Sequence, residues 1–124
     1  MNKKESREDY LEAILVLENK QDFVRAIDIA NELGFSKPSV SIAMKKLKEE
    51  ELIVVRDDGS ISLTEKGKEI AKKTLEKHEF LTNFFIELGI EPDMAEDEAC
   101  QIEHLINDLT FDKLREYVER NKKR

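Results

Sequence analysis

The chain has 124 residues, of which 40% are hydrophobic and another 40% are Asp, Glu, Lys or Arg. This length allows one domain, or one domain with a small second module, and the apolar fraction suffices for a modest core. No apolar run is long enough for a transmembrane helix, and the N-terminus lacks the apolar segment of a secretion signal. Because Cys100 is the one cysteine, an intrachain disulfide is excluded, which fits a reducing compartment. Together these features predict a cytoplasmic protein with no membrane partner.

Charge is unevenly distributed along the chain. The 21 basic and 28 acidic side chains give a net charge of −7, but residues 78–124 hold 6 basic and 12 acidic residues. Residues 36–48 contain four lysines and no acidic residue. A basic helix within an acidic protein is a candidate phosphate-binding surface, although a lysine-rich helix face is more often only solvated.

Helical signals dominate the N-terminal part. Apolar residues at helical spacing predict a first helix from its N-cap, Ser6, to about Lys20, and a second over residues 26–33. Gly34 then stands where a left-handed C-cap is needed. Ser36 is placed to cap a third, basic helix.

The pattern then changes from helical to extended. Residues 52–56 and 60–63 are β-rich and flank an Asp-Asp-Gly turn, which predicts a hairpin. Thr64 is placed to cap a long helix, and Gly89 to end it. The predicted C-terminal helices cover residues 65–88, 93–107 and 111–120. With four Gly and two Pro in the whole chain, the sequence predicts a mainly α fold.

Helix, glycine turn, capped basic helix and hairpin follow in the order of a winged helix–turn–helix. In that geometry the second helix of the motif enters the major groove by its N-terminal end. Hydroxyls and helix-start N–H groups suit phosphate oxygens, and lysines or serines can reach base edges. The candidate DNA-binding residues are Ser36, Lys37, Pro38, Ser39, Ser41, Lys45, Arg56 and Ser60. The simpler alternative is a helical bundle that carries a hairpin and does not bind DNA.

The two histidines have acidic neighbours at helical spacing. Cys100, Glu103 and His104 stand at i, i+3 and i+4 on one predicted helix, which places them on one face. Asp9 and Glu12 form a similar pair on the first helix. Nitrogen and oxygen donors with at most one sulfur suit a divalent first-row metal rather than a closed four-thiolate zinc site. The candidate metal ligands are Asp9, Glu12, His78, Cys100, Glu103 and His104.

Enzyme motifs are missing from the sequence. It has no Ser–His–Asp order, no Gly-rich phosphate loop and no His-Glu-x-x-His, so a binding protein is expected rather than an enzyme. From the residues alone, each candidate ligand also has a structural interpretation, such as a buried apolar cysteine. Two further functions therefore stay open: a winged-helix regulator that responds to another ligand, and a helical protein-interaction module.

Six short motifs occur in order along the chain. They are Asp9-Tyr10-Leu11-Glu12, Ala26-Ile27-Asp28-Ile29-Ala30, Lys37-Pro38-Ser39-Val40-Ser41, Leu63-Thr64-Glu65-Lys66-Gly67, His78-Glu79 and Ile102-Glu103-His104. Together, over residues 6–117, they resemble the metal-dependent transcriptional repressors of the diphtheria-toxin-repressor and manganese-transport-regulator types. The likeness is to a short form without the SH3-like domain of longer members.

The resemblance implies an N-terminal winged helix–turn–helix domain at residues 1–72 and a helical metal-binding and dimerisation domain at residues 73–124. It implies a homodimer that binds a palindromic operator in double-stranded DNA when loaded with Mn²⁺ or Fe²⁺, and in vitro with Co²⁺, Ni²⁺, Zn²⁺ or Cd²⁺. The genes controlled would be those of manganese or iron uptake.

The resemblance also assigns the ligands. Asp9, Glu12, His78, Glu103 and His104 match those of manganese-type members. Cys100 departs from that type, which has a bridging Glu there, and is similar to the iron type. The chain therefore combines features of both types.

Overall fold

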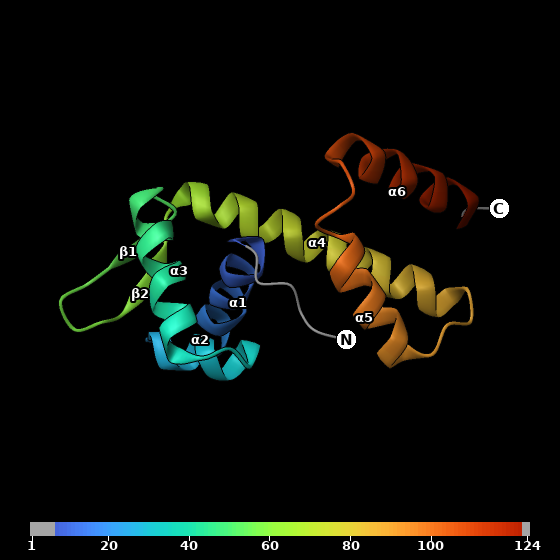
Figure 1. Ribbon diagram of the computed structural model, residues 1–124. Coiled ribbons are helices and arrows are strands. Elements are labelled where there is room, and N and C mark those ends of the chain that lie inside the picture. Colours follow the sequence, from blue (N-terminus) through green and yellow to red (C-terminus); the bar gives the residue numbers. More distant parts are fainter. Residues whose placement is uncertain (1–6, 123–124) are drawn as a thin grey trace. The chain divides into compact units, whose positions relative to one another are not determined.

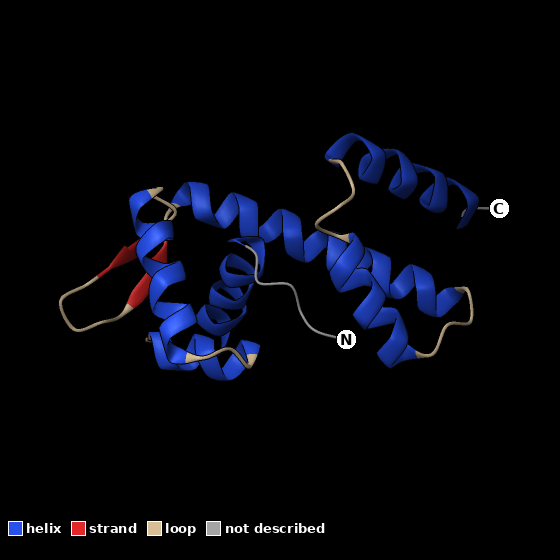
Figure 2. Ribbon diagram, in the orientation of Figure 1, coloured by secondary structure: helices blue, strands red, loops and turns tan. Residues whose placement is uncertain are grey.

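The computed structural model describes residues 7–122, which form a mainly helical chain with one small hairpin (Figure 1). The elements are α1 (Arg7–Lys20), α2 (Ala26–Leu33), α3 (Lys37–Glu49), β1 (Ile53–Val55), β2 (Ile61–Leu63), α4 (Glu65–Glu87), α5 (Pro92–Ile102) and α6 (Asp108–Lys122). The predicted fold class is confirmed, and the two strands are short beside the helices (Figure 2). The expected cap at Ser6 lies outside the described residues. No helix in the described range is both long and apolar enough to span a bilayer.

The chain divides into two compact units, and the boundary between them lies after Thr74, within α4. The N-terminal unit contains α1, α2, α3, the hairpin and the first part of α4. The C-terminal unit contains the rest of α4 with α5 and α6. One continuous helix thus belongs to both units.

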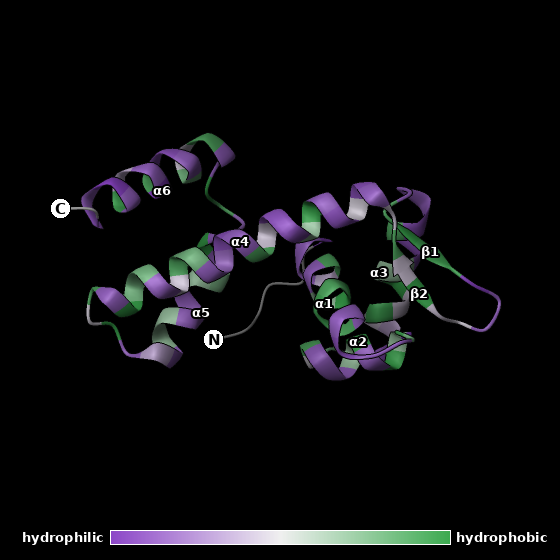
Figure 3. Cartoon of the chain, turned by 180° about the vertical axis from the view of Figure 1, so that it is seen from behind, coloured by the Kyte–Doolittle hydropathy of each residue, from purple (hydrophilic) through white to green (hydrophobic). Residues whose placement is uncertain are grey.

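The core of the N-terminal unit is built from the apolar faces of its helices and from the hairpin. Figure 3 shows apolar residues interspersed with hydrophilic ones along the helices, and apolar residues on the strands. This spacing leaves each helix with one face to bury. The largest apolar side chains that are fully buried in this unit are Leu11, Ile14, Val24, Ile29, Val40 and Leu52.

The turn between α2 and α3 forms as its residues predict. Gly34 has φ 71° and ψ 27°, a left-handed conformation that glycine adopts without a Cβ penalty. The Ser36 hydroxyl oxygen accepts a hydrogen bond from the Ser39 N–H at 3.3 Å, and Pro38 lies in the first turn of α3. The start of the basic helix is therefore fixed by local chemistry.

The predicted hairpin is also confirmed. Its strands are antiparallel, with Ile53 opposite Leu63. In the connecting turn, the Asp58 carboxylate accepts hydrogen bonds from the N–H of Ser60 at 2.8 Å and from its hydroxyl at 2.6 Å. These two bonds hold the pKa of Asp58 below its ordinary value.

The start of α4 is tightly packed against the residue that precedes β1. Thr64 caps the helix, since its hydroxyl oxygen accepts from the Gly67 N–H at 3.1 Å. A Cβ on Gly67 would collide with the backbone carbonyl oxygen of Leu52. Glycine at position 67 therefore allows the close approach of α4 to Leu52.

The prediction for the fifth helix is wrong at its C-terminal end. That helix was expected to reach Asn107, but α5 ends at Ile102 and α6 begins at Asp108 rather than near Phe111. The Asn107 side-chain oxygen accepts from the Leu109 N–H at 2.8 Å, and its backbone carbonyl accepts from the Phe111 N–H. Asn107 is therefore the N-cap of α6. Because an N-cap residue has non-helical backbone angles, Asn107 cannot also belong to α5.

Aromatic side chains organise the core of the C-terminal unit. The rings of Phe80 and Phe111 meet edge to face at 5.5 Å, and Phe80 stacks with Phe84 at 6.1 Å. Phe111 has no exposed surface. Other large apolar side chains of the unit remain exposed, and these include Leu88, Met94, Leu105, Leu109 and Tyr117.

Candidate metal centre and nucleic-acid interface

A buried carboxylate lies between two imidazoles in the C-terminal unit. Glu103 Oε2 lies 2.9 Å from Nδ1 of His78, which belongs to α4. Glu103 Oε1 lies 3.4 Å from Nε2 of His104. The Glu103 side chain has no exposed surface, whereas that of His78 is 18% exposed. A carboxylate at this depth requires cationic or hydrogen-bonding partners, because its desolvation is costly.

Cys100 adds a sulfur to this pair. The ligand atoms of His78, Cys100 and Glu103 all lie within 4.8 Å of one another. One nitrogen, one oxygen and one sulfur at this spacing can converge on a single cation. The donor set fits a divalent transition metal, because imidazole and thiolate suit that class and carboxylate suits its harder members.

Glu103 and His104 reach this position by a different route from the expected one. They were expected on one helix with Cys100, but they follow the end of α5 and lie in a turn. Glu103 keeps helical backbone angles, φ −56° and ψ −28°, and its N–H still donates to the carbonyl of Ala99. Its side chain therefore continues the helical direction for one more residue.

Lys77 holds the segment that follows Glu103. Its Nζ donates to the backbone carbonyl of Ile106 at 3.1 Å and pairs with Asp108 Oδ1 at 2.7 Å. Its side chain is only 8% exposed. Lys77 thereby ties the connection between α5 and α6 to α4, beside His78. Sequence reasoning missed this residue because lysine is almost always solvated, and its position before His78 was the only signal.

The remaining two expected ligands belong to the N-terminal unit. Asp9 and Glu12 lie one turn apart on α1, in the first half of that helix. The C-terminal unit by itself therefore brings together four of the six candidates, which are His78, Cys100, Glu103 and His104.

The candidate DNA-binding residues lie mainly on the exposed start of α3. Ser36, Lys37 and Pro38 are exposed, as are Ser41 and Lys45 further along the helix. Ser39 is half-buried because its hydroxyl and N–H interact with Ser36.

The hairpin candidates differ from each other. Arg56 is exposed, and its guanidinium donates to the Ser62 hydroxyl at 2.7 Å. Ser60, in contrast, is only 2% exposed, and its hydroxyl closes the turn by donating to Asp58. Ser60 is thus a candidate DNA-binding residue whose side chain is buried and already bonded within the turn.

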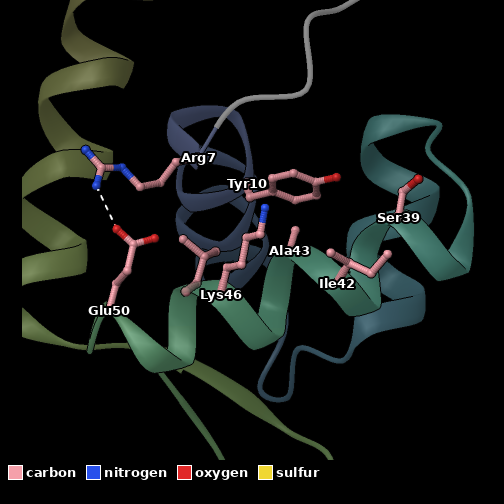
Figure 4. A pocket seen from close by; sticks show the side chains of 8 residues that line it. Arg7, Tyr10, Ser39, Ile42, Ala43, Lys46 and Glu50 are labelled. Atoms are coloured by element: carbon pink, nitrogen blue, oxygen red, sulfur yellow. Dashed lines mark hydrogen bonds and ion pairs between the residues drawn. The ribbon is translucent and has the colours of Figure 1, made fainter.

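A groove of about 310 Å³ lies between α1 and α3 in the N-terminal unit (Figure 4). At one end an ion pair joins Arg7 on α1 to Glu50 after α3, with 2.9 Å between Nη1 and Oε2. Ile42 and Lys46 line the groove from α3. Ile42 is 60% exposed, and sequence reasoning missed it because it looks like an ordinary core residue.

A winged helix–turn–helix with a basic second helix, followed by a helical unit in which N, O and S donors cluster around a buried carboxylate, defines the class of metal-binding DNA-binding proteins. Residues 4–61 match the family described as the iron dependent repressor, N-terminal DNA binding domain. Residues 64–124 match the iron dependent repressor, metal binding and dimerisation domain. The chain belongs to the iron-dependent repressor family.

Individual relatives agree with this assignment. The chain is 30% identical over 120 residues to the transcriptional regulator MntR of Escherichia coli O6:H1. This match covers 97% of the present chain and 77% of the relative. It is 34% identical to an uncharacterised HTH-type transcriptional regulator of Methanocaldococcus jannaschii, with 95% of this chain and 96% of the relative covered.

Solved structures show the same fold. A manganese-dependent transcriptional repressor in complex with manganese superposes with a TM-score of 0.82 at 29% identity. The match covers 92% of this chain and 53% of the solved chain, so the present chain spans about half the length of that structure.

Proposed function

We propose that the protein is a manganese- or iron-responsive transcriptional repressor that binds a palindromic operator as a homodimer. The observation that carries the proposal is the convergence of His78, Cys100 and Glu103 in a unit that shares α4 with a winged helix–turn–helix. The relative named MntR and the repressor solved with manganese support the choice of metal. Family membership favours this function over a protein-interaction module.

The proposed ligand set is larger than the observed cluster. Asp9 and Glu12 on α1 would complete the site with His78, Cys100, Glu103 and His104. When bound, the cation would supply the positive charge that offsets repulsion among these carboxylates. The chain's own residues would then couple α1 to the C-terminal unit, because ligands from both units would share one site.

The proposed DNA surface is the start of α3 with the hairpin. Ser36, Lys37, Ser39 and Ser41 would contact phosphates and base edges. Pro38, Lys45 and Arg56 would extend this contact along the sugar–phosphate backbone of the DNA. Residues 1–72 would thus bind DNA, and residues 73–124 would bind metal and form the dimer. The protein would act in the cytoplasm, as a binding protein and not as an enzyme.

The proposal is tested by titrating Mn²⁺, or Fe²⁺ without oxygen, into the full chain and a DNA site selected from a random library. Metal is expected to raise DNA affinity by about 5–150-fold, the range of a coupling of about 1–3 kcal/mol. Equal affinity in metal and in chelator would contradict the proposal.

A charge-reversal variant tests the DNA surface separately. Lys37→Glu combined with Lys45→Glu should abolish DNA binding, because it places acidic groups against phosphates. The same variant should leave metal binding intact, since both positions lie on α3. Undiminished DNA binding would show that another surface is used.

A further inference from the structure

The outward face of α3 carries an isoleucine that the core does not use. Ile42 stands two residues after Val40 and two residues before Met44, and the side chains of Val40 and Met44 are buried. An α-helix turns about 100° per residue, so Ile42 points away from both of them. Its 60% exposure agrees with this position.

The charges around Ile42 indicate which partner covers it. Lys45 and Lys46 are exposed on either side of the direction in which Ile42 points, and residues 36–48 contain no acidic residue. The next acidic residues, Glu49 and Glu50, lie at the C-terminal end of the helix, where Glu50 pairs with Arg7. Figure 4 shows Ile42 on α3, between Ser39 and Lys46 along the helix. A surface with an apolar centre and a cationic border fits a polyanion that presents an apolar group between its phosphates.

We propose that Ile42 reads a thymine by contact with its 5-methyl group in the major groove. This inference rests on the proposed DNA binding and names the base that the helix selects. The thymine methyl is the apolar group on the base edges of that groove, and aliphatic side chains recognise it by contact. The Ile42 side chain has no hydrogen-bonding atoms, so it specifies an A·T pair through shape and burial alone.

The experiment uses the full chain in excess MnCl₂ and a random double-stranded DNA library. Sites are selected for the wild type, for Ile42→Gln and for Ile27→Ala. Ile27 is a matched control, since it is an isoleucine 41% exposed on α2. The wild type and I27A should select the same site, with a thymine in each half-site. I42Q should change that position to adenine, which glutamine contacts through N6 and N7.

Deoxyuridine then removes only the methyl group from each selected thymine. At the position read by Ile42, this should weaken wild-type binding about fourfold, which corresponds to about 0.8 kcal/mol for one buried carbon. Ile42→Ala should remove this sensitivity while leaving the other positions unchanged. Because position 42 is exposed, I42A should unfold at the same urea concentration as the wild type.

Two outcomes would overturn the inference while the proposed function stands: metal-dependent binding with no thymine sensitive to the methyl group, or equal sensitivity in wild type and I42A. The absence of any metal-dependent selected site would instead overturn the proposed function and the inference together.

Discussion

His78 and Glu103 lie 2.9 Å apart, Nδ1 to Oε2, although they come from α4 and from the turn after α5. This contact is the centre of the candidate metal site, since Cys100 and His104 both lie beside Glu103. A buried carboxylate held by two imidazoles is costly to form, and a functional role explains its presence better than stability does.

Replacing Glu103 by glutamine should weaken metal binding by at least about tenfold, because the amide keeps the shape but loses the negative charge that attracts the cation. Calorimetric titration with Mn²⁺ and Co²⁺ measures the change. Glu96→Gln, on the exposed side of α5, is the control and should bind as the wild type does. Unchanged affinity in Glu103→Gln would remove this residue from the site.

Cys100→Ser should change the order of metal preference. A thiolate favours softer ions, so the variant should lose more affinity for Cd²⁺ than for Mn²⁺. Competition with a chromophoric chelator gives both affinities on one sample. Equal losses for the two ions would indicate that the Cys100 sulfur does not coordinate metal.

Lys77→Met should destabilise the protein by about 1–3 kcal/mol, because it removes a buried donor from the Ile106 carbonyl while keeping the length of the side chain. Urea unfolding measures the loss. Lys113→Met removes only the exposed pair with Glu116 and should cost at most about 1 kcal/mol. Similar losses in both variants would contradict the role given to Lys77.

Gly67→Ala should destabilise the N-terminal unit by about 1–3 kcal/mol, since the added Cβ meets the Leu52 carbonyl and the backbone must shift. The measurement is again the urea midpoint. Lys68→Ala, at the next position of α4, is the control for placing alanine in this turn of the helix where no backbone clash is expected. A stabilised Gly67→Ala variant would show that α4 can move away from Leu52 at no cost.

Asp58→Asn should alter the pH dependence of stability. The hydrogen bonds from Ser60 lower the pKa of Asp58 in the folded state, so the stabilisation is present above the ordinary value of 3.8 and is lost as pH falls through the lower folded value. The difference in unfolding midpoint between wild type and variant should therefore shrink at acidic pH. Asp57→Asn, which leaves the Asp58–Ser60 bonds in place, should show a smaller change with pH. A wild-type-to-variant difference that is independent of pH would contradict this account.

The sequence alone determined the elements whose signals are local. Gly34 and Ser36 define the turn before α3, Thr64 starts α4, and the Asp58-Gly59 turn closes the hairpin. Each depends on hydrogen bonds or backbone angles within a few residues. Helical spacing likewise identified the residue types of the candidate site, since a period of 3.6 predicts a shared face.

Tertiary structure decided what depends on distant partners. Asn107 caps α6 instead of continuing α5, and Glu103, which keeps helical angles at the end of α5, meets His78 of α4. Lys77 is buried only because the carbonyl of Ile106 and the carboxylate of Asp108 compensate its charge. Such pairings form when the attraction between the two groups exceeds the free-energy cost of removing them from water. Both quantities depend on how the helices pack, so the local sequence does not determine them.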